Sequence, residues 1–332
     1  MSEAFRALVV DKKDEDVSVE IKNLTLDDLP EGEVTIKVAY SSVNYKDGLA
    51  SIPNGNIVSS YPFVPGIDLS GVVVDSKDDQ FKEGDEVIVT SYGLGVSHYG
   101  GYSEYARVPA KWVVPLPEGL TLKEAMAYGT AGFTAALSVY RLEKQGLNPD
   151  MGPILVSGAT GGVGSIAVSI LAKKAYHVIA STGKASEHSY LKELGAAEII
   201  SREALRPEKI RPLNKQKWAG AVDPVGGETL SYILTATQYG GAVAVSGLTG
   251  GPKVPTTVMP FILRGVSLLG VDSVECPMEI RKPLWERMAT DLKPDLLLKD
   301  IGQEVTLDEL PDVLAKILKG KTRGRTIVKI QE

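Results

Sequence analysis

The stretch Ile154-Leu155-Val156-Ser157-Gly158-Ala159-Thr160-Gly161-Gly162-Val163-Gly164 indicates how the centre of the chain folds. Its apolar start suits a short buried strand, its glycines a tight turn, and apolar residues then recur at helical spacing up to Leu171. Ala159-x-Gly161-x-x-Gly164 fits the dinucleotide-binding fingerprint, with alanine at the first position. A turn that only packs a helix on a strand is the alternative, but a second strand at 177–182 follows in order. We therefore predict that a pyrophosphate binds at the helix start, at Thr160, Gly161, Gly162 and Val163.

Composition limits the function classes. The 332 residues suffice for two domains with separate cores, and 23% of them are charged. The net charge of −6 argues against a nucleic-acid-binding protein, which needs a basic face. No apolar run reaches the length of a membrane span, and no signal-peptide pattern opens the chain. Cys276 is the single cysteine, so a reducing cytoplasm is the expected location.

The order of patterns along the chain predicts the architecture. Residues 1–125 hold short strand-like runs separated by turn signals, which favours a compact, partly open β-barrel. Helical patterns follow at 123–128 and 131–143, and strands then alternate with helices to about residue 270, as in a doubly wound parallel sheet. An amphipathic helix is predicted at 307–319 and a returning strand at 325–330. We predict an α/β fold with a catalytic domain (1–125 and 272–332) and a cofactor domain (126–271). The strands predicted in the first domain are 5–10, 17–21, 34–40, 69–74, 86–90 and 103–108.

Several longer segments resemble a known family. The segments 65–71 (PGIDLSG), 129–135 (GTAGFTA) and 223–227 (DPVGG), with the fingerprint, resemble the medium-chain dehydrogenase/reductase superfamily over the whole chain. The segments 43–47 (VNYKD) and 255–264 (PTTVMPFILR) are similar to its bacterial acryloyl-CoA reductase branch, whose members are also labelled quinone oxidoreductases. The resemblance implies a GroES-like β-barrel catalytic domain, a Rossmann cofactor domain and oxidoreductase activity.

A metal site is not expected. Zinc needs three or four converging nitrogen, sulfur or oxygen ligands. The positions that hold catalytic zinc ligands in relatives are here Asn44 and the segment Gly66-Ile67-Asp68. The chain has three histidines, spread over a glycine-rich loop, a strand and a helical stretch, and one distant cysteine. The resemblance suggests a structural role for Asp68, pairing with a basic residue.

The loop after the second strand indicates which nicotinamide cofactor is bound. Sites that prefer NAD place an acid there, but this chain reads Ser181-Thr182-Gly183-Lys184. Hydroxyl donors and a cation suit a 2′-phosphate, so we predict NADPH, with Ser181, Gly183 and Lys184 in contact with it. A solvated loop lysine is the alternative for Lys184. The resemblance adds Arg202 as a further cation, and it implies cofactor contacts at Thr130, Leu248, Ile262 and Ser273.

A reductase without a metal is suited to conjugate reduction, in which hydride adds to the β-carbon of an enone or enoyl thioester. The resemblance places Tyr45 at the nicotinamide end of the active site. We predict that Tyr45 contacts the cofactor or donates to the substrate, the alternative being a packed wall residue. Asp47 is expected to cap the following helix. For a CoA ester, Arg264, Arg281, Arg323 and Arg325 are candidate phosphate ligands.

The leading hypothesis is an NADPH-dependent, zinc-free reductase of a short enoyl thioester such as acryloyl-CoA. The alternatives are an NADPH:quinone oxidoreductase and a non-catalytic NADPH-binding sensor. The substrate is expected to be a small molecule. The segment 266–271 resembles the edge strand through which relatives pair, which implies a homodimer.

Overall fold

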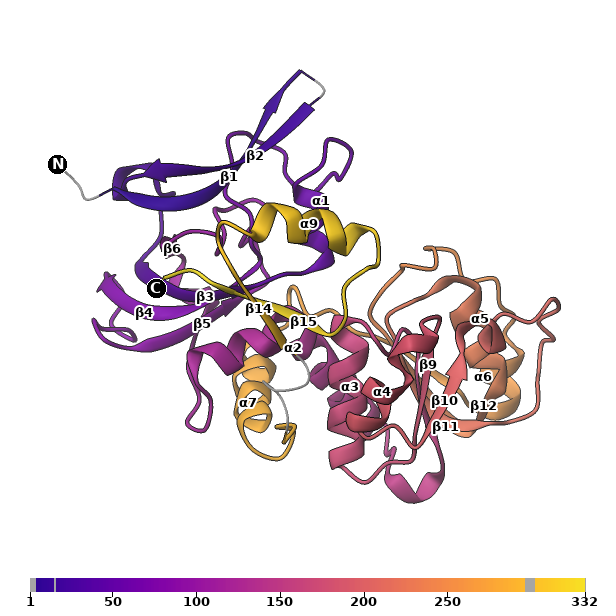
Figure 1. Ribbon diagram of the computed structural model, residues 1–332. Helices are drawn as coiled ribbons and strands as arrows, with labels where there is room; N and C mark the ends of the chain where they lie inside the picture. Colours follow the sequence, from indigo (N-terminus) through magenta and orange to yellow (C-terminus); the bar gives the residue numbers. More distant parts are fainter. Residues whose placement is uncertain (1–3, 15, 296–301, 332) are drawn as a thin grey trace. The chain divides into compact units, whose positions relative to one another are not determined.

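The computed structural model describes residues 4–14, 16–295 and 302–331 (Figure 1). The described chain divides into two compact units. The first unit holds the residues up to Thr130, Val274–Ala289 and those from Gly302 onward, and the second holds Ala131–Ser273 with residues 290–295. None of the helices among these described residues is long and apolar enough to cross a membrane.

The first unit is mostly β. A hairpin of β1 (Phe5–Lys13) and β2 (Asp16–Leu24) accompanies a larger sheet in the order β14-β15-β3-β4-β5-β7, with β6 also paired to β3. The returning strand β15 (Arg325–Lys329) pairs antiparallel with β3 (Val34–Ser42), as the sequence predicted for the tail of the chain. The side chains of Val34, Ile36 and Val38 alternate inward along β3 into the core. The remaining strands of this sheet are β4 (Asp68–Ser76), β5 (Glu86–Thr90), β6 (Tyr105–Val108), β7 (Val113–Pro115) and β14 (Gly302–Thr306).

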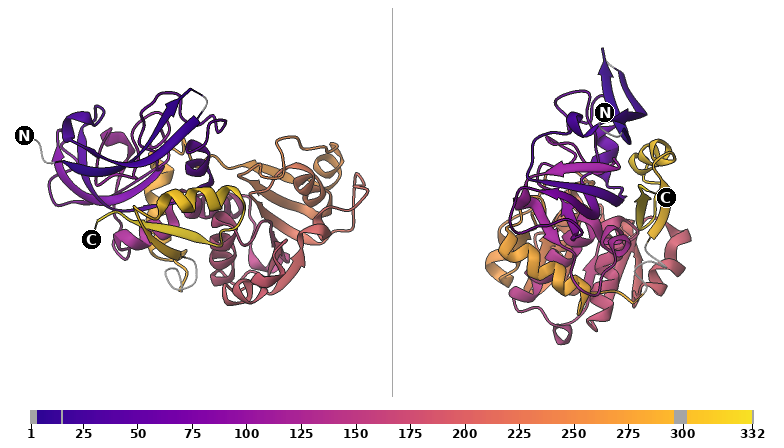
Figure 2. Two further views of the ribbon diagram at one scale, coloured as in Figure 1. Left: turned by 45° about the horizontal axis from the view of Figure 1, so that its top comes forward. Right: turned by 90° about the vertical axis from the view of Figure 1, so that its left-hand side faces the viewer.

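Two short helices pack against each other in this unit. In Figures 1 and 2, α1 (Tyr45–Ala50) lies beside α9 (Leu310–Leu318). Their contact is close, because a Cβ on Gly48 would stand 2.9 Å from Ile317 Cγ2. The helix predicted from residue 307 begins at Leu310, since the Glu309 carboxylate accepts from the N–H and hydroxyl of Thr306 and holds that segment in a turn. The unit also contains α7 (Met278–Ala289) and the 3-10 helices η1 (Leu26–Asp28) and η2 (Ala110–Trp112).

One long helix, α2 (Leu122–Lys144), passes from the first unit into the second. Its helical geometry is interrupted at Gly129, which has φ 52° and ψ −158°. Glycine suits this position because the left-handed side of φ space is strained for other residues. A Cβ there would also stand 2.4 Å from an Asp68 carboxylate oxygen. The interruption separates the two helical runs that the sequence predicted at 123–128 and 131–143.

The second unit is built on a parallel sheet of six strands in the order β10-β9-β8-β11-β12-β13. The chain starts at β8, builds outward through β9 and β10, and then returns to the other side of β8 with β11. Such a reversal defines the switch point at which open α/β sheets bind ligands. The strands are β8 (Ile154–Val156), β9 (Val178–Thr182), β10 (Glu198–Ser201), β11 (Trp218–Asp223), β12 (Thr237–Val245) and β13 (Ser267–Gly270).

Helices connect these strands in the order expected of a doubly wound sheet. The second unit's core joins strand residues such as Leu155 and Val243 to helix residues such as Leu230 and Ile233. The connections are α3 (Gly162–Lys173), α4 (His188–Glu193), α5 (Gly227–Ala236), α6 (Met259–Arg264), η4 (Ala185–Glu187) and η5 (Arg202–Leu205). The 3-10 helix η3 (Pro149–Met151) precedes β8.

Candidate functional site

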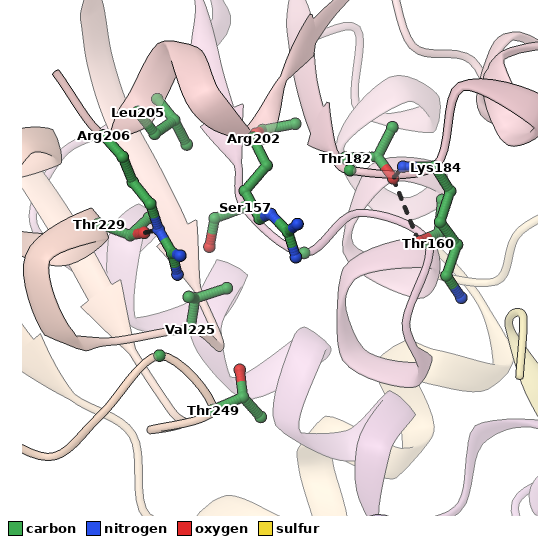
Figure 3. Close-up of a pocket in the computed structure, with 14 residues that line it drawn as sticks. Ser157, Thr160, Thr182, Lys184, Arg202, Leu205, Arg206, Val225, Thr229 and Thr249 are labelled. Atoms are coloured by element: carbon green, nitrogen blue, oxygen red, sulfur yellow. Dashed lines mark hydrogen bonds between the residues drawn. The ribbon is translucent and has the colours of Figure 1, made fainter. Parts of the chain in front are cut away.

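A pocket of about 300 Å³ lies in the second unit, at the carboxyl ends of β8, β9, β10 and β11 (Figure 3). Three cations line it, and none of its lining residues is an acid. The pocket therefore favours an anionic ligand. The lining residues that follow β8 and β9 are Ser157, Gly158, Thr160, Ser181, Thr182, Gly183 and Lys184. Those that follow β10, β11 and β12 are Arg202, Leu205, Arg206, Val225, Thr229, Thr249 and Gly250.

The glycine turn forms one wall of the pocket. Gly158 has φ +54°, and its carbonyl accepts from the N–H of Gly161 at 3.0 Å. Gly161 is the N-cap of α3 and provides no side-chain cap. The first N–H groups of α3 therefore have no capping side chain, which suits an anionic ligand. Gly161, Gly162 and Val163 are not among the residues that line the pocket, so their contact with a cofactor stays a prediction. Thr160 lines the pocket directly, with its hydroxyl oxygen 3.4 Å from that of Thr182.

Gly164 is the glycine of this turn that a side chain would disturb most. A Cβ at Gly164 would stand 2.3 Å from the Gly158 carbonyl oxygen and 2.7 Å from the Ala159 Cα. We expect Gly164→Ala to lower the free energy of unfolding by about 2 kcal/mol, because the backbone of the turn must move. Gly161→Ala is the matched control, since its Cβ would meet one atom at 3.3 Å. Urea unfolding checks both variants, and equal losses would contradict the argument.

The loop after β9 forms the opposite end of the pocket. Ser181 and Thr182 are buried, and the Thr182 hydroxyl accepts from the backbone N–H of Lys184 at 3.0 Å. The Arg202 guanidinium lies over Gly183, because a Cβ there would stand 3.0 Å from Arg202 Cζ. The structure thus brings the predicted residues Ser181, Gly183, Lys184 and Arg202 into one pocket.

Sequence reasoning missed several residues of this pocket, chiefly Thr182, Arg206, Thr229 and Thr249. Thr182 stands between two predicted residues, so its position in the Ser-Thr-Gly-Lys loop was an available signal. Arg206 had a weaker signal, because an arginine in a loop is usually solvated surface. Thr229 and Thr249 come from α5 and the loop after β12, and only the fold places them here.

Three other predicted cofactor contacts of the second unit do not line this pocket. Leu248 and Ile262 are 65% and 71% exposed. Ser273 is buried and accepts from the Thr134 hydroxyl at 2.7 Å. Contact of these residues with a cofactor stays a prediction.

In the first unit, α1 presents the predicted residue Tyr45. Tyr45 is the first residue of the helix and is 49% exposed. The cap before it is formed by Asn44 and Asp47, whose carboxylate accepts from the N–H of Asn44 at 2.8 Å. The other oxygen of Asp47 accepts from the N–H of Ile67 at 3.0 Å. Asp47 therefore has the capping role that the sequence predicted.

Asp47 should make the stability depend on pH. Burial, together with the neighbouring charge of Asp68, raises the pKa of Asp47 to about 7, although the hydrogen bonds from Asn44 and Ile67 act to lower it. The Asp47 carboxyl group therefore stays protonated in the folded protein between about pH 4 and pH 7, whereas in the unfolded chain it is ionised over this range. As a result, we expect this group to lower the free energy of unfolding by about 2 kcal/mol from pH 5 to pH 7, with no further loss above. Urea titrations of the wild type and Asp47→Asn should differ by that slope, and parallel pH profiles would contradict it.

A buried network surrounds Asp68. Its carboxylate accepts from the Ser42 hydroxyl at 2.6 Å and from the Asn44 amide at 2.7 Å. It also accepts from Thr130, from the N–H at 2.9 and 3.0 Å and from the hydroxyl at 2.5 Å. Arg325 Nη2 is 3.7 Å from Asp68 and donates to Ser42 at 2.7 Å. The basic partner expected for Asp68 is thus Arg325, and the polar groups of Thr130 bind Asp68.

Three of the arginines considered for CoA phosphates have other roles. Arg264 donates to the carbonyls of Thr235 and Asn214, at 2.8 and 2.7 Å. Arg281 is fully buried and donates to Thr90. Arg325 is 3% exposed and lies beside Asp68. Arg281 and Arg325 are thus buried and Arg264 is half-buried, with their donors bonded inside the fold, which leaves Arg323, an exposed residue, as the remaining candidate.

Comparison with known proteins places the chain in a family. A sequence model of the alcohol dehydrogenase GroES-like domain matches residues 30–118, and one of zinc-binding dehydrogenases matches residues 162–290. "Putative quinone oxidoreductase YhfP" of Bacillus subtilis (strain 168) is 60% identical, covering 99% of this chain and 100% of its own length. "Acrylyl-CoA reductase AcuI" of Ruegeria pomeroyi is 51% identical, with 98% and 99% covered.

Solved structures agree with this placement. The Bacillus subtilis yhfP structure with NAD bound superposes with a TM-score of 0.97 and covers 99% of this chain and 100% of that one. The yhdH oxidoreductase of Salmonella enterica in complex with NADP is 46% identical, with a TM-score of 0.96 and 98% and 100% covered. The chain belongs to the medium-chain dehydrogenase/reductase superfamily of oxidoreductases, in the branch that includes AcuI and YhfP. The predicted fold class, a GroES-like domain with a Rossmann domain, is confirmed.

The description of one family model as zinc-binding does not fit the residues at the corresponding positions. Asn44 and Asp68 bind each other, and Arg325 Nη1 donates to Asn44 Oδ1 at 3.2 Å. Among the residues that the structure describes, no three histidine, cysteine, aspartate or glutamate side chains form a group that could hold a metal ion. A guanidinium, not an open set of ligands, adjoins these residues, so no step of the chemistry is assigned to zinc.

Proposed function

We propose that this protein is an NADPH-dependent reductase of the C=C bond of a short enoyl thioester, of the acryloyl-CoA class. The observation that carries the proposal is the pocket of the second unit, in which cations and hydroxyls gather without an acid. Such a pocket suits the 2′-phosphate of NADPH and lacks the carboxylate that selects NAD. The name of the 51% identical Ruegeria relative, and the NADP in the Salmonella structure, support this proposal. The Bacillus structure contains NAD, which makes cofactor preference a point to measure.

Within this proposal, different residues contact different parts of the cofactor. The pyrophosphate is bound by the backbone N–H groups of Thr160, Gly161, Gly162 and Val163. Ser181, Gly183, Lys184 and Arg202 surround the 2′-phosphate, where charge-assisted hydrogen bonds are strong. Further contacts are proposed at Tyr45, Thr130, Leu248, Ile262 and Ser273.

The chemistry proposed for the site needs orientation more than acid strength. When bound, the dihydronicotinamide supplies a hydride, which adds to the β-carbon of the thioester, while a proton from solvent adds to the α-carbon. Acryloyl-CoA, NADPH and a proton then give propionyl-CoA and NADP⁺, so atoms and electrons balance. We assign to Tyr45 the hydrogen bond that orients the nicotinamide or donates to the thioester oxygen as charge develops there.

A second candidate function is the reduction of quinones, which the name of the 60% identical Bacillus relative favours. The two functions differ in acceptor only. Purified protein with NADPH should oxidise the cofactor rapidly with acryloyl-CoA, more slowly with crotonyl-CoA, and little with benzoquinone. Tyr45→Phe should lower kcat with acryloyl-CoA while NADPH binding is kept. Turnover with the quinone alone would replace the proposed function by the alternative.

The proposal also includes the oligomeric state and the cellular location of the protein. The strand β13 lies at the edge of its sheet, and Leu268 on it is 40% exposed, which favours a homodimer paired through this edge. The single cysteine, Cys276, is buried and has no partner cysteine in the chain, which favours a reducing cytoplasm. Light scattering of the purified protein at micromolar concentration should give the mass of a dimer.

A further inference from the structure

The pocket of the second unit contains a second arginine, Arg206, which is bonded to α5 and lies beside the loop after β12. Its Nε donates to the Thr229 hydroxyl at 3.2 Å, and Thr229 is buried in α5. Its Nη2 lies 3.4 Å from the point where a Cβ on Gly250 would stand. Arg206 is exposed, and its hydrogen bond to α5 orients the guanidinium beside the loop after β12.

Arg206 and Arg202 serve different parts of the pocket. Arg202 lies over Gly183, in the loop that follows β9. In Figure 3, the Arg202 side chain is directed toward the side of Thr182 and Lys184, and the Arg206 side chain toward Thr229 and Val225. A phosphate in the Ser181–Lys184 loop would use Arg202, so Arg206 is available to another group of the same ligand.

The surroundings of Arg206 suit a flat ring better than a second phosphate. Leu205 and Val225 add aliphatic surface to the wall, and Thr229 and Thr249 are neutral. A guanidinium is planar and weakly hydrated, so it stacks on aromatic faces. The attraction between a guanidinium and an aromatic face is typically worth about 0.5–2 kcal/mol.

We propose that Arg206 stacks on the adenine ring of the bound cofactor, and that Thr229 positions Arg206 for this contact. The inference rests on the proposed function for the identity of the ligand, but it needs no reducible substrate. It assigns Arg206 to affinity for the adenosine half and leaves the choice between NADPH and NADH to the Ser181–Lys184 loop and Arg202.

The test is a set of binding titrations by calorimetry, with NADPH, NADH and 5′-AMP as the probes. We expect Arg206→Ala to weaken all three by the same factor, about 10-fold. Arg206→Lys keeps the charge but not the plane, so it should show most of this loss. Thr229→Val is a near-isosteric control for positioning and should give a smaller loss, again equal for the three ligands. Thermal melts of the variants identify any loss caused by misfolding.

The outcomes separate the inference from the proposed function. A loss confined to NADPH would assign Arg206 to the 2′-phosphate and overturn the stacking contact, as would unchanged affinity in Arg206→Ala. If Arg206→Lys kept the full affinity for the ligands, the charge alone would be responsible, and this result would also overturn the stacking contact. The reductase proposal survives each of these results. It fails instead if the wild type binds NADPH normally yet reduces no enoyl thioester, and that result leaves the stacking contact intact.

Discussion

Replacing Lys184 and Arg202 together by alanine is expected to raise the KM for NADPH about 100-fold and to leave kcat/KM for NADH nearly unchanged. Both side chains line the pocket at the loop after β9, where no lining residue is an acid. Hydrogen bonds from cations to a charged phosphate contribute about 1.5–3 kcal/mol each, which corresponds to a factor of roughly 10 or more per residue. NADH has no 2′-phosphate and loses none of these contacts.

Steady-state rates with both cofactors at a fixed concentration of acceptor measure this effect. Lys215→Ala is a suitable control, because Lys215 is an exposed lysine of the same unit that does not line the pocket. Equal losses with NADPH and NADH would show that these residues act on the shape of the pocket and not on the 2′-phosphate.

Arg325→Met is expected to lower the free energy of unfolding by about 3–5 kcal/mol, because it leaves the Asp68 carboxylate buried without its cation. Asp68 is fully buried and Arg325 is 3% exposed. Arg325 also donates to the carbonyls of Val43 and Ala127, at 2.9 and 3.3 Å. These bonds join the last strand to two segments, one just before α1 and the other just before the interruption of α2 at Gly129.

A double variant tests whether the buried charge is the cause. Asp68→Asn removes the negative charge and keeps an acceptor for Thr130, so Asp68→Asn with Arg325→Met should be more stable than Arg325→Met alone. Denaturant titrations of the three variants measure this coupling. Additive losses would mean that Arg325 acts through packing and its bonds to carbonyls.

The parts of the site that the sequence predicted are those encoded locally. The glycine turn from Gly158 to Gly164 has its strand, its turn and its helix within a few residues, so spacing alone places it. The Ser181–Lys184 loop is recognisable for the same reason, because the absence of an acid is a property of one short segment. Asp47 caps its own helix, three residues after Asn44, and was also predictable.

Contacts between distant segments could not be predicted in this way. Asp68 and Arg325 are brought together by the pairing of the last strand with β3, and no periodicity encodes that neighbour. Arg264, Arg281 and Arg325 were candidate phosphate ligands, and their internal bonds could not be predicted, because burial of an arginine depends on partners from elsewhere in the fold. Arg206 and Thr229 likewise meet only because η5 ends and α5 begins at the same pocket.

Hydride transfer to the β-carbon of an enoyl thioester is the reaction proposed for this protein. The most direct measurement uses NADPH carrying deuterium at C4, with acryloyl-CoA, and locates the label in the product by NMR. We expect propionyl-CoA with one deuterium at the β-carbon and none at the α-carbon. Deuterium at the α-carbon, or no labelled propionyl-CoA while benzoquinone is reduced, would contradict it.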